Sequence, residues 1–123
     1  MALTAMHEVD MTRCLLLSLA EWRDSQSSAP QEVRTVHLDV GEFTCVEPDA
    51  LFTTYAAAVG GTWLERSSLK INSIPLVGRC PCCDSTYTPT VTQQYRSPCC
   101  SAPLEDILSG RELRIRRIES API

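Results

Sequence analysis

Positive charge is scarce in this sequence, and so are long apolar runs. Its 11 lysine and arginine residues face 15 aspartate and glutamate residues, which gives a net charge of -4 at pH 7 and a pI of about 5.1. Since nucleic-acid affinity depends largely on clustered cations, we expect no nucleic-acid partner. The most apolar segment, residues 14–20, is far shorter than the ~20 residues that span a bilayer, and acidic residues precede it. We therefore expect a cytoplasmic protein that does not associate with membranes.

Histidine is also rare, whereas cysteine is abundant and unevenly placed. The chain has 2 histidines and 7 cysteines, and five of the cysteines lie within residues 80–100. A disulfide framework suits a secreted chain with an even number of cysteines and a signal peptide, and this sequence shows neither feature. The clustering therefore predicts a metal site, and thiolate ligands favour Zn(II).

The cysteine-rich segment has the spacing of a zinc ribbon with one irregular half. Cys80 and Cys83 form a C-x-x-C pair, and 15 residues separate Cys83 from Cys99. A regular second pair would begin at position 97, where this sequence has a serine, and would end at Cys100. Cys99 is the nearest substitute for the missing ligand, and Cys82 is the other candidate.

Two other functions of this segment fit its composition less well. A thioredoxin-like redox pair needs Cys80 at the start of a helix, and the prolines and threonines after Cys83 disfavour a helix there. A nucleic-acid-binding ribbon needs a basic face, yet residues 77–106 carry two arginines against two aspartates and one glutamate. Because a segment of this size has too small a core to fold unaided, a structural zinc ion is the main prediction.

The rest of the chain predicts a small α+β domain. Apolar residues recur at helical spacing over residues 9–22 and 48–59. Apolar and polar residues alternate over residues 33–40, 62–76 and 112–119, with a break in parity at Ile118 that suggests a bulge. These patterns predict two helices and a three-stranded sheet built from residues 1–76 and 107–123, with residues 77–106 inserted as a zinc-ribbon-like domain.

A histidine and a glutamate are adjacent near the start of the chain, in the segment AMHEVDM. The H-E-x-x-H motif of zinc hydrolases is absent, because its second histidine is replaced by Met11. On a helix, His7 and Glu8 would point about 100 degrees apart, so they could share a site through their side chains only if this segment were unwound. An unwound segment could surround Ni(II) or Cu(II) with imidazole and amide nitrogens and a carboxylate. On spacing alone, a solvated His7 without a special role is the more frequent outcome.

Three other residues that could serve in a site have simpler interpretations. His37 falls on the polar face of its predicted strand, where we expect it to be exposed or to face a partner rather than to be a metal ligand. Cys14 and Cys45 stand apart from the cysteine cluster, and we expect both to be small buried apolar residues.

Four segments together resemble one protein family. They are MHE at residues 6–8, VGEFTCVEPDAL at residues 40–51, the cysteine-rich segment, and LRIRRIE at residues 113–119. In this order they are similar to the HypA/HybF family of nickel-iron hydrogenase maturation factors. The resemblance implies a nickel metallochaperone rather than an enzyme. It would act as a monomer or homodimer with a HypB-type GTPase to load nickel into the hydrogenase large subunit precursor.

The resemblance also implies roles for individual residues. It implies that His7 binds nickel, with Glu8 beside it and Glu47 close to the site. It further implies zinc ligation by Cys80, Cys83 and Cys100, to which the spacing adds Cys99. The family usually begins at the methionine before the histidine, so that the terminal amine can serve as a ligand, whereas MALTA precedes Met6 here. The alternatives are a zinc-ribbon interaction or nucleic-acid module without a nickel role, and a thiol redox protein.

Overall fold

The computed structural model describes residues 3–26 and 30–123, and it describes the side chains of the first helix from Glu8 onward. Two helices, α1 (Leu3–Ser25) and α2 (Pro48–Val59), accompany the strands β1 (Gln31–Gly41), β2 (Ser68–Ile74) and β6 (Leu113–Pro122). A second group of strands comprises β3 (Val77–Arg79), β4 (Thr86–Tyr87) and β5 (Asp106–Ser109). Short 3-10 turns lie at Glu42–Thr44 and Val91–Gln93. Within the described ranges, no helix has the length and apolar character needed to cross a membrane.

The chain divides into two compact units. The first contains residues 1–38, 46–72 and 114–123, and the second contains residues 39–45 and 73–113. The second unit therefore includes residues 39–45, which the sequence predicts as part of the main domain. The predicted division into a nickel-binding and a zinc-binding domain stays a prediction. The predicted α+β class is confirmed.

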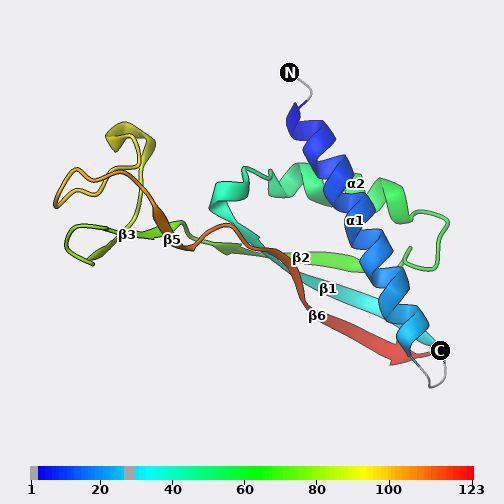
Figure 1. Cartoon of the computed structure of the whole chain (residues 1–123). Coiled ribbons are helices and arrows are strands. Elements are labelled where there is room, and N and C mark those ends of the chain that lie inside the picture. Colours follow the sequence, from blue (N-terminus) through cyan, green and yellow to red (C-terminus); the bar gives the residue numbers. More distant parts are fainter. Residues whose placement is uncertain (1–2, 27–29) are drawn as a thin grey trace. The chain divides into compact units, whose positions relative to one another are not determined.

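The first unit is a three-stranded sheet, in the order β2-β1-β6, with both helices against one side of it (Figure 1). The predicted helix at 48–59 matches α2, because Pro48 fits the first turn and Gly60 follows the last residue. The predicted first helix is shorter than α1, which begins at Leu3. Apolar side chains from α1, α2 and β1 form the core, and its buried members include Leu15, Leu19, Val36, Leu38, Leu51, Tyr55 and Val59.

From Val36 onward, strand β1 is buried on both of its faces, so the expectation that His37 is exposed is wrong. Its residues from Val36 to Gly41 are all buried, and His37 is only 6% exposed. The reason lies in β6, where the Glu119 carboxylate bonds His37 Nε2 and the Arg117 guanidinium lies 3.2 Å from the same nitrogen. Hydrogen bonding to His37, followed by the charge of Arg117, lowers the pKa of Glu119. Alternation along β1 alone could not reveal that neighbouring side chains cover its polar face.

The second unit contains a sheet in the order β4-β3-β5, with β3 antiparallel to both neighbours. The chain also approaches itself closely at two glycines. A Cβ on Gly41 would lie 2.0 Å from the Gly110 carbonyl oxygen, and the Gly41 N–H donates to the Glu112 carbonyl at 2.7 Å. The absence of a side chain at Gly41 therefore lets residues 39–45 join the unit. An edge-to-face contact between Phe43 and Tyr95, with ring centroids 6.2 Å apart, adds to this attachment.

Candidate metal centre

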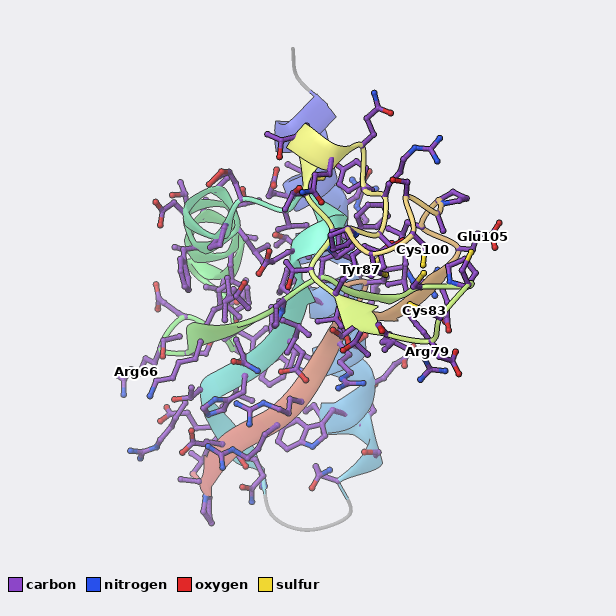
Figure 2. The ribbon with its side chains drawn as sticks, turned by 90° about the vertical axis from the view of Figure 1, so that its left-hand side faces the viewer. Arg66, Arg79, Cys83, Tyr87, Cys100 and Glu105 are labelled. Carbon is purple, nitrogen blue, oxygen red and sulfur yellow. The ribbon has the colours of Figure 1, made fainter. Side chains whose placement is uncertain are left out.

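Four of the seven cysteines come together in the second unit. The Sγ atoms of Cys80, Cys83, Cys99 and Cys100 all lie within 4.8 Å of one another, and Cys82 is outside this group. Figure 2 shows Cys83 and Cys100 side by side at the cluster, with Tyr87 nearby. Cys80 is fully buried, whereas the other three cysteines of the group are exposed. Of the two candidates that the sequence left open for the fourth ligand, the structure brings Cys99 into the group.

The cysteines are carried by two tight turns, at residues 80–85 and 97–102. In the first, the Cys80 N–H donates to the Ser85 carbonyl at 2.8 Å and the Asp84 N–H donates back to the Cys80 carbonyl at 2.9 Å. In the second, the Ser97 N–H donates to the Ala102 carbonyl at 2.9 Å, and the Ser101 N–H donates to the Ser97 carbonyl at 2.9 Å. Each turn ends through a left-handed residue, with φ of 65° at Asp84 and 52° at Ser101. Both turns therefore use the same backbone geometry to present their side chains to one point.

The group fits a tetrahedral thiolate-bound ion. Four sulfurs at ~2.3 Å from Zn(II) would lie about 3.8 Å from one another. The pair Cys83 and Cys99 is already at 3.3 Å, and no pair exceeds 4.8 Å, so an ion requires side-chain movements of only about 1 Å. Four soft sulfur donors without a carboxylate favour zinc over magnesium or calcium.

The thiols differ in their readiness to ionise. A hydrogen bond with the Ser97 side chain is the main cause that lowers the pKa of Cys80 to about 6, against its burial. Hydrogen bonding to Cys83 is the main cause that raises the pKa of Cys100 to about 12. Cys80 directly follows β3 rather than starting a helix, so the arrangement expected of a thioredoxin-like redox pair is absent there. Hydrogen bonding to Ser85 lowers the pKa of Cys83 as well, whereas hydrogen bonding to Cys83 raises that of Cys99. A metal ion bound by all four sulfurs would displace the remaining thiol protons.

The residues predicted for nickel lie in the first unit. His7 falls within α1, and its side chain lies outside the described residues. Because α1 begins at Leu3, the segment around His7 and Glu8 is helical rather than unwound. The side chain of Glu8 is fully buried, and its Oε1 accepts a hydrogen bond from the backbone N–H of Glu47 at 2.9 Å. Its Oε2 is buried without a hydrogen-bond partner among the described residues.

Glu47 contributes its backbone rather than its side chain to this contact. It is the N-cap residue of α2, where the first amides of a helix lack partners within the helix. Its side chain is exposed and makes no cap hydrogen bond of its own. The buried carboxylate of Glu8 therefore fixes α1 to the first turn of α2, which sequence reasoning did not anticipate.

Three further residues depart from the sequence predictions or were overlooked by them. Cys14 and Cys45 were expected to be buried, and both are exposed. Cys14 lies on the side of α1 away from the core, and Cys45 takes a left-handed conformation at the end of a 3-10 turn. Ser97 was treated only as a missing ligand, yet it is buried and contacts Cys80. The repeated P-C-C in CPCC (residues 80–83) and SPCC (residues 97–100) is the sequence signal that Ser97 takes the position that corresponds to Cys80.

Comparison with known proteins shows which family this chain is similar to. A family model described as "Hydrogenase/urease nickel incorporation, metallochaperone, hypA" matches residues 6–120. Hydrogenase maturation factor HypA of a Synechococcus strain is 49% identical over 93% of this chain and 86% of its own length. Guanidine hydrolase-activating protein A of Synechocystis is 44% identical over 93% of this chain and 94% of its own length. The solution structure of the Ni metallochaperone HypA from Helicobacter pylori covers 94% of this chain and 98% of its own with a TM-score of 0.66, and at 14% identity it shows a shared fold.

Proposed function

This chain belongs to the HypA family of metallochaperones, and from that premise we propose that it binds one Ni(II) ion and delivers it for nickel-iron hydrogenase maturation. The observation that carries the proposal is the extent of the family match. It covers residues 6–120, and so includes both the His7–Glu8 pair and the four-cysteine group. Nickel is the cargo, and zinc is the structural ion. The protein acts by holding and transferring a metal ion, not by catalysis.

The nickel-binding part is residues 1–76 and 107–123, with His7 as the principal side-chain ligand. Imidazole nitrogen suits Ni(II), and the ring must be neutral to bind, so affinity falls as the pH drops through the ordinary histidine pKa of ~6.5. Glu8 and Glu47 are the predicted auxiliary ligands. Since the Glu8 carboxylate holds the Glu47 N–H, its use as a ligand requires that this contact be released or shared with the metal.

The zinc-binding part is residues 77–106, and Zn(II) is held by Cys80, Cys83, Cys99 and Cys100. Bound zinc neutralises the thiolates and ties the two turns together. Because so short a segment has little core of its own, the free energy of metal binding becomes free energy of folding. All seven cysteines are unpaired, and thiolate ligands persist in a reducing compartment, which supports a cytoplasmic location.

The partners that fit this role are a HypB-type GTPase and the precursor of the hydrogenase large subunit. Membership of a family for nickel incorporation supports an association with maturation proteins. Nothing in the charge balance favours nucleic acid, since the net charge is -4. The protein acts as a monomer or a homodimer.

A second client is a guanidine hydrolase. The chain is 44% identical to guanidine hydrolase-activating protein A, which lies between its 49% identity to HypA of Synechococcus and its 30% identity to HypA proteins from Chloroflexus and Picosynechococcus. The two candidates differ in the recipient and share the same metal-binding residues on this chain. Producing each recipient with and without this protein, and measuring its metal content and activity, distinguishes them.

The test of the nickel role is a titration of the purified protein at neutral pH. We expect one Ni(II) per chain, and we expect His7→Ala to lose most of the affinity while zinc content stays unchanged. A chain that begins at Met6 should bind nickel more tightly than the 123-residue chain if the terminal amine is a ligand. Nickel binding by His7→Ala equal to that of the parent would refute the proposed site. His37→Ala is the matched control, because that histidine is engaged by Glu119 in the sheet.

A further inference from the structure

The two turns that carry the cysteines match residue by residue. The turns have the sequences CPCCDS at 80–85 and SPCCSA at 97–102. They share the same pair of backbone hydrogen bonds and have a left-handed residue at the same position, Asp84 in one and Ser101 in the other. Position 97 therefore corresponds to Cys80, and Cys100 corresponds to Cys83. By the same matching, Cys99 corresponds to Cys82, which lies outside the sulfur group.

This correspondence makes the two halves of the site unequal. In the first turn, the first and fourth residues enter the group, whereas in the second turn the third and fourth do. Cys99 thus contributes from a position whose counterpart, Cys82, is exposed and does not belong to the group. The turn itself is not distorted to achieve this, because its hydrogen bonds are as short as those of the first turn.

The side chain of Ser97 occupies the place of the missing sulfur. It is only 2% exposed, and its Oγ lies 3.3 Å from Cys80 Sγ. The same Oγ accepts a hydrogen bond from the Ala102 N–H at 3.1 Å. In the structure the Cys80 thiol donates to this Oγ. A metal-bound Cys80 is a thiolate without a proton, so the direction must reverse, and the Ser97 hydroxyl donates to the sulfur while its oxygen still accepts from the Ala102 N–H. Backbone amides make the equivalent bonds to metal-bound sulfurs in regular zinc turns.

We propose that Ser97 is a positioning residue of the zinc site, whose hydroxyl donates to the Cys80 thiolate from the place of the absent fourth cysteine, while Cys99 supplies the fourth sulfur from outside the regular turn positions. Ser97 is small enough to leave room for the Cys99 sulfur beside Cys83, at 3.3 Å. Restoring a cysteine at 97 should therefore make Cys99 dispensable. This inference rests on the proposed zinc site and is independent of nickel delivery.

The test uses the full chain and five variants: Cys99→Ser, Cys82→Ser, Ser97→Ala, Ser97→Cys, and Ser97→Cys combined with Cys99→Ser. Zinc content and chelator competition give stoichiometry and affinity. Substitution by Co(II) gives the number of bound thiolates from the sulfur-to-cobalt charge-transfer absorption. None of these readouts depends on nickel or on a client enzyme.

We expect the parent and Cys82→Ser to hold one ion with four thiolates, and Cys99→Ser to show three thiolates and the weakest binding. Ser97→Ala should keep four thiolates but lose affinity by about 10–100-fold, the usual effect of removing a partner of a ligand. Ser97→Cys combined with Cys99→Ser should return to four thiolates and at least the parent affinity.

Each contrary result has a distinct meaning. A parent that binds no zinc would overturn the proposed zinc site itself. Four thiolates in Cys99→Ser, or three in Cys82→Ser, would overturn the assignment of Cys99. Parent-like affinity in Ser97→Ala, or failure of the double variant to recover, would overturn the role given to Ser97.

Discussion

Replacing Glu8 should destabilise the first unit, because its carboxylate joins two helices. Glu8→Ala removes the acceptor of the Glu47 N–H, a bond of 2.9 Å to a charged group. Hydrogen bonds to charged groups contribute ~1.5–3 kcal/mol, and an anion near a helix N-terminus adds ~0.3–1 kcal/mol. Loss of the buried γ-methylene group costs about 0.8 kcal/mol. Removing the unpartnered Oε2 returns ~1–3 kcal/mol, so the net loss should be about 2 kcal/mol.

Glu8→Gln should cost less than Glu8→Ala. The glutamine oxygen can accept from the same N–H and the side chain fills the same space, so the main loss is that of charge. We expect about 1 kcal/mol for this variant.

The assay is urea unfolding of the zinc-loaded protein at neutral pH, followed by far-ultraviolet circular dichroism. Glu47→Ala is the matched control: it removes an exposed carboxylate but keeps the backbone N–H, so its free energy of unfolding should stay within about 0.5 kcal/mol of the parent. Equal stability of Glu8→Ala and the parent would refute the structural role. Titrating the same variants with nickel then separates a positioning role from ligation. If the Glu8 carboxylate is a nickel ligand, Glu8→Gln should bind nickel more weakly than the parent at temperatures where the variant is fully folded.

Three other perturbations test different parts of the structure. Cys83→Ala should lose zinc and make the second unit sensitive to protease, which zinc analysis and limited proteolysis would show; an intact zinc-free unit would contradict the structural role of the metal. The lowered pKa of Glu119 means that its contribution is complete above the ordinary glutamate pKa of ~4.3 and is lost as the pH falls through the folded-state value. The stability advantage of the parent over Glu119→Gln should therefore be present at neutral pH and disappear in acid, and an advantage that persists in acid would show that the bond to His37 is not its source. Gly41→Ala would place a Cβ 2.0 Å from the carbonyl oxygen of Gly110, so thermal unfolding should detect a loss of more than ~2 kcal/mol, with Gly61→Ala as a comparison that has open space but a φ of 74°.

The sequence predicted most accurately those features that depend on nearby residues. Pro48 and Gly60 marked the ends of α2, and the C-x-x-C spacing identified the segment whose cysteines form the four-sulfur group. These signals are local because turn geometry, helix ends and ligand spacing operate over a few residues.

Features that depend on distant partners could not be predicted in this way. The burial of His37 depends on Glu119 from the end of the chain, and that of Glu8 on the amide of Glu47. Alternation and helical periodicity describe one element at a time, so they do not show which side chains cover it. Cys99 is an intermediate case. The second P-C-C is visible in the sequence, but which of its cysteines reaches the sulfur group depends on the conformation of the turn.

The proposed pairing of the two turns by one zinc ion would also affect how the connecting chain can change length. A metal that joins residues 80–83 to residues 99–100 closes a loop, and the entropy lost on closure grows only logarithmically with the number of residues enclosed. Doubling that loop costs about 0.6 kcal/mol, far less than the ~10 kcal/mol or more that a thiolate zinc site contributes. Insertions beside the 3-10 turn at Val91–Gln93 should therefore be tolerated, whereas a single residue inserted within either turn would change which side chains meet the ion. Length variation among related chains should accordingly concentrate between the turns and spare the turns themselves.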